Sequence, residues 1–437
     1  MRAPLPPEAR LELAALHASL SSPVSESMNF LNEVAQRFPD AISFAAGRPY
    51  EGFFDLDLVH EYIETYRAHA GRRLGGDETA VRREILQYGR TKGIIHELIA
   101  ENLRVDEGIT ADPDDVVVTV GCQEALYLTL RALRRDDRDV LLAVVPSYVG
   151  VHGAAQLADM RVLPVRDSAA GIDLADLAEA VRRARAAGLR PRACYLVPDF
   201  ANPSGVSLDA DIRRELLRLS EELDILLLED NPYGLFSDGS GPPTLKALDE
   251  NNRVVYLGTY AKTGVPGARV GFAVAGQRVS MPGGVTRSLA DQLAKLKSML
   301  TVNTSPIAQA VIGGKLLAHG CSLRAANARE TEVYLGNLRR MRVGLAERFP
   351  AGDGPEVTWN SPTGGFFMLL TLPFPAGDDL LELSAHKHRV LWTPLHHFYA
   401  ETRPRHEIRL SYSHLLPAEI DEGLDRLAGF VRERAAR

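Results

Sequence analysis

Residues 254–272 read VVYLGTYAKTGVPGARVGF, an apolar run followed by a turn. The run 254–257 is short and rich in β-branched residues, which predicts a buried strand. The hydroxyl and glycine residues after it predict a turn that holds Lys262, with Arg269 seven residues further on. Burial lowers the pKa of a lysine and makes its amine usable as a nucleophile, notably toward carbonyl compounds. Lys262 is therefore a candidate covalent anchor, although most turn lysines are solvated.

Apolar runs alternate with helical patterns on both sides of this stretch, between residues 116 and 275. Such alternation predicts an α/β fold with a mainly parallel sheet covered by helices. The expected strands are 116–120, 140–145, 161–165, 193–197, 225–229, 254–257 and 270–275.

The pattern changes after a long helix expected over about 284–300. Helices around 308–319 and 330–348, strands at 366–372, 390–392 and 408–411, and a final helix predict a smaller α+β domain. We therefore expect an N-terminal arm and first helix (1–40), a large domain (41–305) and a small C-terminal domain (306–437).

Composition restricts the class of protein. The chain has 45% hydrophobic and 24% charged residues and a net charge of −7, which is typical of a globular protein and gives no nucleic-acid signature. Its three cysteines are too scattered for a disulfide framework or a zinc site. The sequence shows neither a signal peptide pattern nor an apolar run of membrane-spanning length. We expect a cytoplasmic protein that acts on small molecules, without nucleic-acid or membrane partners.

Polar residues follow several of the expected strands, where ligands bind in open α/β sheets. A glycine turn at Gly121 opens a helix whose free N–H groups favour an anion such as phosphate. Tyr148 could stack on a flat ring, although packing is the more common role of a tyrosine. Asn202 could offer an amide to an oxygen on such a ring.

Asp230 ends the strand at 225–229, where a buried carboxylate needs a cationic partner. The N–H of a pyridinium ring is one such partner, and an aspartate there makes the ring an electron sink, as in pyridoxal phosphate chemistry. With Lys262, the chain then offers a phosphate cradle, a ring stack, an amide, a carboxylate and an amine.

At this point the sequence resembles the class I/II aminotransferases, which have the type I fold of pyridoxal-phosphate-dependent enzymes, and is most similar to the aminoadipate and kynurenine aminotransferase branch. The resemblance spans nearly the whole chain and rests on short motifs in a fixed order. They are ISFAAGRP (42–49), QYG (87–89), GCQ (121–123), PDFANPSG (198–205), EDNPY (229–233), AKT (261–263) with PGAR (266–269), PTGGF (362–366) and IRLSYS (408–413).

The resemblance implies a role for each matching residue. Lys262 would form a Schiff base with pyridoxal 5'-phosphate and act as the general base, and Asp230 would pair with the pyridine nitrogen. Asn202 and Tyr233 would reach the phenolic oxygen of the ring, and Tyr148 would stack on it. Phosphate contacts would come from Gly121, Cys122, Gln123, Thr259, Arg269 and, from a neighbouring subunit, Tyr88.

For the substrate, the resemblance implies that Arg409 grips the α-carboxylate by a bidentate fork. Asn202 and Arg48 are further candidates for substrate contacts. A site that draws on two subunits implies a homodimer with shared active sites.

The chain departs from the family pattern at three places, one of which is Gly264, where a bulkier residue is common. Ala261 stands where serine is frequent. The stretch PLHHF (394–398) replaces the usual Pro-Gly, a small residue and Phe. His396 and His397 can titrate near neutrality and could bind a polar substrate, and a solvated loop is the equal alternative.

Three functions remain open at this level. The first is transamination between an α-amino acid and a 2-oxo acid. The second keeps the cofactor but carries out β- or γ-replacement, decarboxylation or carbon–carbon bond formation. The third is the ligand-sensing domain of a transcriptional regulator, which the acidic charge and the roughly 40 residues before the first motif disfavour.

Overall fold

The structure is a computed structural model that describes residues 10–22, 24, 27, 33, 36–352, 354–399 and 403–436. Residues 1–9, 23, 25, 26, 28–32, 34 and 35 of the expected N-terminal arm and first helix lie outside the described residues. Within them, no helix has the length and apolar character needed to cross a membrane.

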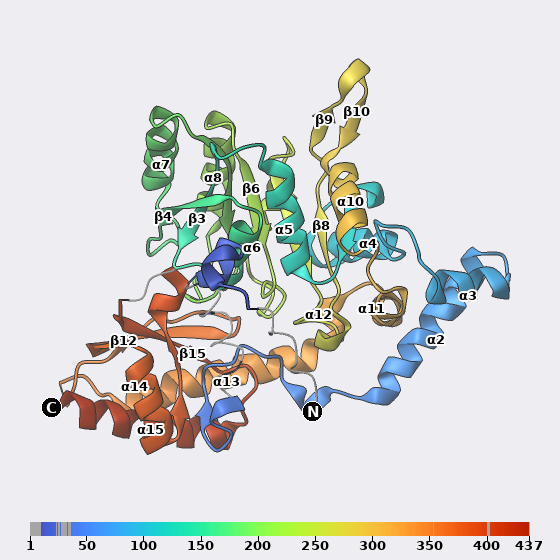
Figure 1. Ribbon diagram of the computed structural model, residues 1–437. Coiled ribbons are helices and arrows are strands. Elements are labelled where there is room, and N and C mark those ends of the chain that lie inside the picture. The colour runs from blue at the N-terminus through green and yellow to red at the C-terminus, as the bar shows by residue number, and fades with distance from the viewer. Residues whose placement is uncertain are drawn as a thin grey trace, which may run out of the picture.

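A seven-stranded sheet forms the centre of the large domain (Figure 1). All seven expected strands are present, and each is parallel to its neighbours except β8, which is antiparallel to both β2 and β7. The spatial order is β2 (Val116–Thr119), β8 (Gly271–Val274), β7 (Val254–Thr259), β6 (Leu226–Asp230), β5 (Arg190–Leu196), β3 (Asp139–Val145) and β4 (Arg161–Arg166).

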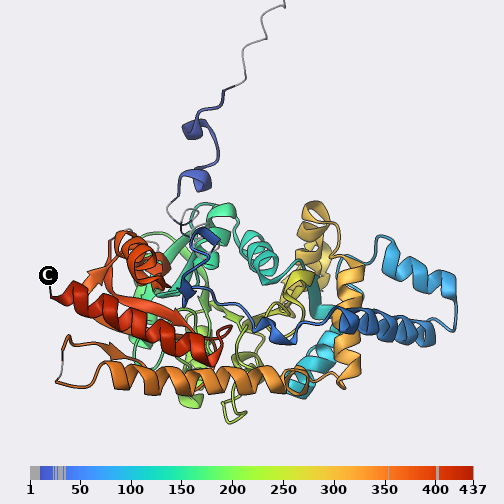
Figure 2. The same cartoon turned by 90° about the horizontal axis from the view of Figure 1, so that it is seen from below.

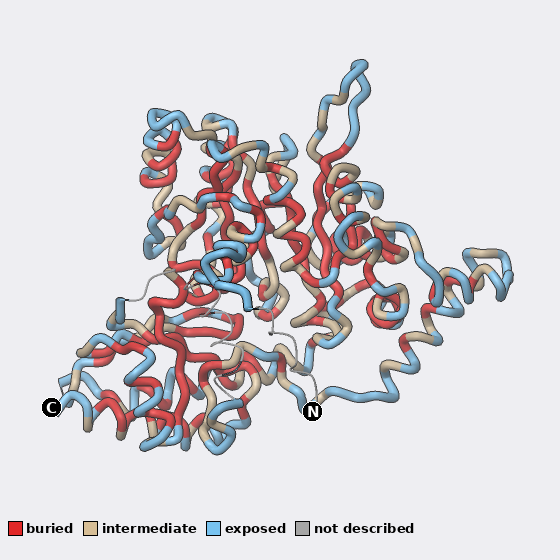
Figure 3. Tube along the Cα trace, in the orientation of Figure 1, coloured by how far each residue is buried: buried red, intermediate tan, exposed pale blue. Residues whose placement is uncertain are grey.

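Helices cover both faces of this sheet because its strands are apolar on both sides. Leu141 packs with helices α5 (Cys122–Leu133), α6 (Val149–Leu157) and α10 (Leu289–Leu300) on one face. Its neighbour Leu142 packs on the other face with α7 (Leu174–Ala186) and α8 (Ala210–Glu222). Helices α2 (Leu56–Arg73), α3 (Glu78–Leu86), α4 (His96–Glu107) and α11 (Pro306–Ala318) enclose a further core beside β2 and β8. The buried trace therefore runs through the sheet (Figure 3).

The expected long helix from residue 284 is wrong at its start. A hairpin of β9 (Arg278–Ser280) and β10 (Thr286–Ser288) occupies this position, and α10 begins only at Leu289. Gly283 and Gly284 have positive φ, which turns the chain, and Ser288 with Asp291 forms a capping box that starts the helix.

The small domain is built on a four-stranded antiparallel sheet of order β11 (Thr358–Trp359), β12 (Phe367–Ala376), β15 (Arg405–Ser411) and β14 (Thr393–Pro394). Helices α13 (Ala328–Arg348) and α15 (Pro417–Ala435) pack side by side along it (Figure 2). Strand β1 (Ile42–Ser43) pairs with β13 (Val390–Leu391), and Phe44 enters the core of the small domain. The start of the motif at 42–49 thus packs with the four-stranded sheet and its helices.

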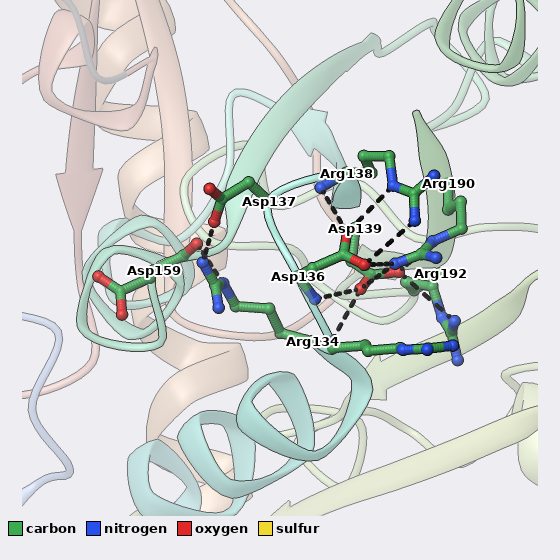
Figure 4. Close-up of polar contacts among 9 residues, drawn as sticks. Arg134, Asp136, Asp137, Arg138, Asp139, Asp159, Arg190 and Arg192 are labelled. Carbon is green, nitrogen blue, oxygen red and sulfur yellow. Dashed lines mark hydrogen bonds and ion pairs between the residues drawn. The ribbon is translucent and has the colours of Figure 1, made fainter. Parts of the chain in front are cut away.

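A polar cluster closes the amino end of β3 and β5, opposite the strand ends with the candidate residues (Figure 4). Asp139 is 1% exposed and accepts hydrogen bonds from the Arg190 guanidinium at 3.0 and 2.9 Å. The backbone N–H groups of Arg135 and Asp136 donate to the same carboxylate. A buried charge of this kind needs such partners, so the cluster is structural.

Candidate active site

A cavity of about 270 Å³ lies at the carboxyl ends of the central strands and reaches the small domain. Its walls bring together most of the residues that the sequence singled out. They are Cys122, Gln123, Tyr148, Asn202, Asp230, Tyr233, Thr259, Lys262, Arg269 and Arg409.

Lys262 follows β7 and places its amine inside this cavity. Its Nζ donates a hydrogen bond to the backbone carbonyl of Gly47 at 2.8 Å. Desolvation, followed by the positive charges of Arg409, Arg269 and Arg48, lowers the pKa of the Lys262 amine to about 8. A substantial fraction of the amine is therefore neutral, and nucleophilic, at mildly alkaline pH.

Asp230 ends β6 and is 5% exposed. Its carboxylate accepts hydrogen bonds from the Tyr195 hydroxyl at 2.7 Å and from the Cys122 thiol at 3.4 Å. Burial raises the pKa of Asp230 to about 6, although the two hydrogen bonds lower it. Among the described residues no cationic side chain forms an ion pair with it, so the site favours a cationic group in the cavity.

An anion cradle lies beside Asp230, at the start of α5. Gly121 has φ +75° and precedes the helix, whose first residues are Cys122 and Gln123. A Cβ at Gly121 would lie 2.5 Å from the Arg269 guanidinium, so only glycine lets this cation approach the helix start. Thr259 also lines the cavity here. A helix N-terminus next to a guanidinium fits a phosphate group.

Arg409 is a further cationic residue in the wall of the cavity. It is 5% exposed, and its guanidinium donates to the Asn202 side-chain oxygen at 2.6 Å, the Ala45 carbonyl at 2.6 Å and the Thr393 hydroxyl at 3.2 Å. The rings of Phe367 and Phe398 lie on it, with centroids 4.3 and 4.8 Å from its Cζ.

The buried Nε of Arg409 has no hydrogen-bond partner, and none of the described carboxylates pairs with the guanidinium. Desolvation lowers the pKa of Arg409 to about 10. A buried cation in this state is suited to an anionic ligand such as a carboxylate.

Two aromatic residues complete the cavity at Asp230. Tyr233 is buried, and burial raises the pKa of its phenol, although the positive charge of Arg409 and a hydrogen bond with Asn202 lower it. Tyr148 caps α6, and burial raises the pKa of its phenol to about 12. Both phenols are therefore protonated and can donate hydrogen bonds at neutral pH.

Four expected site residues lie away from this cavity wall. Tyr88 is 81% exposed, as suits a residue that could reach a second subunit, and Arg48 is also exposed. We expected His396 or His397 to line the substrate pocket. Instead both rings are buried against Asp378, because the turn Leu395–Tyr399 directs Phe398 to the cavity and the two imidazoles elsewhere.

Three residues that line the cavity or contact its wall were not anticipated from sequence. Tyr195 reads as an ordinary residue of a buried strand, and only the register of β5 beside β6 reveals its contact with Asp230. Phe367 follows the PTGGF motif, and Phe398 follows the histidine pair, so their neighbours in sequence were the available signal.

The donor set of the cavity fits pyridoxal phosphate. The anion cradle at Gly121 matches a phosphate group, and the carboxylate of Asp230 pairs with none of the described cations and matches a pyridinium nitrogen. The amine of Lys262, with its lowered pKa, matches an aldehyde carbon.

Comparisons with known proteins agree with this chemistry. The family described as "Aminotransferase class I and II" matches residues 31–427. A protein of Amycolatopsis orientalis named (S)-3,5-dihydroxyphenylglycine transaminase is 53% identical over 425 residues, covering 97% of this chain and 95% of the relative. A 2-aminoadipate transaminase of Thermus thermophilus is 30% identical and covers 91% of each chain. The crystal structure of Pyrococcus horikoshii kynurenine aminotransferase superposes with a TM-score of 0.77 at 28% identity, covering 96% of both chains.

Proposed function

The chain belongs to the class I and II aminotransferases, a pyridoxal-phosphate-dependent family, and from this premise we propose that it transfers the amino group of a hydroxylated arylglycine. The substrate we propose is (S)-3,5-dihydroxyphenylglycine or its 2-oxo acid, after the 53% identical relative. The observation that carries the proposal is the buried guanidinium of Arg409, which pairs with none of the described carboxylates and contacts two phenyl rings in the cavity that holds the Lys262 amine.

When bound, pyridoxal phosphate supplies an aldehyde carbon for amino groups and a ring that withdraws electrons. Lys262 would hold it covalently. The Nζ of Lys262, when it is not bonded to the cofactor, would remove the proton from the substrate Cα. An ionised Asp230 would keep the facing ring nitrogen protonated, and Asn202, Tyr233 and Tyr148 would orient the ring.

Arg409 would fix the substrate by its carboxylate. The hydrogen bonds to Asn202 and Ala45 hold the guanidinium in place, so its free edge is fixed before the substrate enters. The adjacent rings of Phe367 and Phe398 would favour an aryl group attached directly to Cα.

We also propose that a second copy of this chain completes the site. The segments 86–89 and 299–307 are adjacent, since a Cβ at Gly89 would lie 3.9 Å from the Asn303 side chain and 4.0 Å from Pro306. Together they expose an apolar surface that a monomer rarely leaves uncovered. It comprises Leu86, Tyr88, Met299, Leu300, Val302 and Ile307, each 48 to 86% exposed.

The test is an amino-transfer assay with the cofactor-loaded enzyme. (S)-3,5-Dihydroxyphenylglycine is incubated with a panel of 2-oxo acids, and both products are quantified by chromatography. Equal amounts of the aryl oxo acid and a new amino acid support the proposal, with the (R)-enantiomer as control. Release of CO2 without a new amino acid would instead indicate decarboxylation.

A further inference from the structure

The histidine pair of the small domain forms a cluster that the aminotransferase site does not use. His396 and His397 lie in the turn Leu395–Tyr399, and Asp378 lies just after β12. The two imidazoles are 4% and 5% exposed, and their ring centroids are 4.2 Å apart. We propose that Asp378, His396 and His397 bind a divalent transition metal ion such as Zn²⁺.

The geometry brings three suitable donor atoms to one point. One carboxylate oxygen of Asp378 lies 2.8 Å from Nε2 of His397 and 3.7 Å from Nε2 of His396. One ligand atom from each residue fits within a span of 4.8 Å. Two imidazoles and one carboxylate are a common ligand set for zinc and related metals, with the remaining positions taken by water.

Hydrogen bonding alone leaves His396 unexplained. Its buried Nδ1 finds no hydrogen-bond partner among the described residues, and its Nε2 lies 3.7 Å from the Asp378 carboxylate, beyond hydrogen-bond range. A metal ion between the two Nε2 atoms and the carboxylate would give Nε2 of His396 a partner, and Nδ1 of His396 would remain outside the metal site.

The surroundings of His397 suit a metal ligand. Its Nδ1 lies 2.7 Å from the hydroxyl of Ser27, an outer contact of the kind that orients metal-bound imidazoles. A hydroxyl donates or accepts, so Ser27 can serve both when Nε2 carries a proton toward Asp378 and when Nε2 binds a metal and the proton moves to Nδ1. The Asp378 side chain is 49% exposed, which gives a path for entry and room for water ligands.

A bound metal ion would lie outside the aminotransferase cavity but close to one of its walls. Phe398 directly follows His397 and lines the cavity, and its carbonyl accepts a hydrogen bond from the Ser147 N–H at 2.9 Å. The metal would therefore clamp the turn that carries this aromatic wall and, through Ser27, a residue of the N-terminal segment.

Zinc binding to the full-length, cofactor-loaded protein tests the proposal independently of its substrate. After chelator treatment and gel filtration, the protein is titrated with Zn²⁺ by calorimetry, and Co²⁺ serves as a spectroscopic probe. We expect one equivalent of Zn²⁺ and visible absorption bands for bound Co²⁺. Ser27→Ala should weaken the Zn²⁺ affinity about tenfold, and Asp378→Asn or His397→Gln should weaken it further.

The matched control is His60→Ala, which removes an exposed histidine of α2 and should leave zinc binding unchanged. Circular dichroism and melting temperature verify the fold of each variant. Asp378→Asn keeps the shape of a half-exposed side chain, so this variant remains informative if a histidine variant fails to fold. Absence of stoichiometric uptake, or equal uptake by wild type, Asp378→Asn and His397→Gln, would overturn the proposal and leave a hydrogen-bonded cluster only.

Discussion

The hydroxyl of Tyr195 donates a 2.7 Å hydrogen bond to the carboxylate of Asp230, and both side chains are buried. The two residues come from adjacent parallel strands, β5 and β6. A hydrogen bond to the ionised form of a carboxylate lowers its pKa, so Tyr195 opposes the effect of burial on Asp230.

We therefore predict that Tyr195→Phe weakens cofactor retention. The hydrogen bond to an ionised Asp230 is worth about 1.5–3 kcal/mol, which corresponds to roughly a tenfold to hundredfold increase in the dissociation constant of pyridoxal phosphate. Equilibrium dialysis measures this constant, with Tyr127→Phe in the adjacent core as control. Unchanged retention in Tyr195→Phe would mean that Asp230 does not carry the cationic ring.

Asp230→Asn should stabilise the cofactor-free protein near neutral pH. The folded-state pKa of Asp230 is raised from 3.8 to about 6, so the folded protein binds more protons than the unfolded chain between these values, and stability falls as pH rises through this window. Removing the charge should recover up to about 3 kcal/mol at pH 7.5 and little below pH 4. Urea unfolding at both pH values tests this, and a loss of stability at pH 7.5 would contradict it.

The amine of Lys262 should titrate near pH 8 in the cofactor-free protein, against an ordinary value of 10.5. Below this pH it is protonated and unreactive, and above it the amine is neutral. Acetylation followed by peptide mapping gives the labelling rate at Lys262 against pH. Arg409→Gln should move the midpoint upward, because the positive charge of Arg409 contributes to the lowered pKa. A midpoint above pH 10 in the wild-type protein would contradict the claim that burial lowers the pKa of Lys262.

Features of the fold and the site that follow from local residue patterns are predictable from the sequence. Asp230 ends one strand and Lys262 follows another, and the apolar runs of the sequence predicted both strands. The contact of Tyr195 with Asp230 was not predicted, because it depends on the register of two adjacent strands, which no local pattern encodes. The hairpin at 278–288 was not predicted, because the residues after it have a helical pattern and the expected helix was extended back to residue 284. The glycine turn and the Ser288 cap in fact place the start of the helix at Leu289. The partners of His396 and His397 likewise come from distant segments, at Asp378 and Ser27.

Phe398→Ala should reduce the preference for aryl substrates. The ring is one wall of the cavity beside Arg409, so its loss should lower kcat/KM for (S)-3,5-dihydroxyphenylglycine about tenfold more than kcat/KM for alanine. The comparison between substrates cancels any general effect on the carboxylate site. An equal loss for both substrates would place aryl recognition elsewhere in the cavity.

The apolar surface at 86–89 and 299–307 should hold the protein as a dimer. Met299→Asp places a charge on a side chain that is 86% exposed in the single chain, so it should disrupt a dimer without disturbing the fold of the subunit. Analytical ultracentrifugation measures the oligomeric state, and Lys295→Asp on α10 is a control for added charge. A wild-type monomer at micromolar concentration would contradict the shared site.

Covalent trapping of the cofactor tests the central claim most directly. Borohydride reduction of the cofactor-loaded enzyme, followed by peptide mapping, should place the pyridoxyl group on Lys262. Lys262→Ala should remain folded, give no label at this peptide and show no amino transfer from (S)-3,5-dihydroxyphenylglycine, whereas Lys295→Ala should match the wild type. A label on another lysine, or amino transfer at the wild-type rate by Lys262→Ala, would contradict the account.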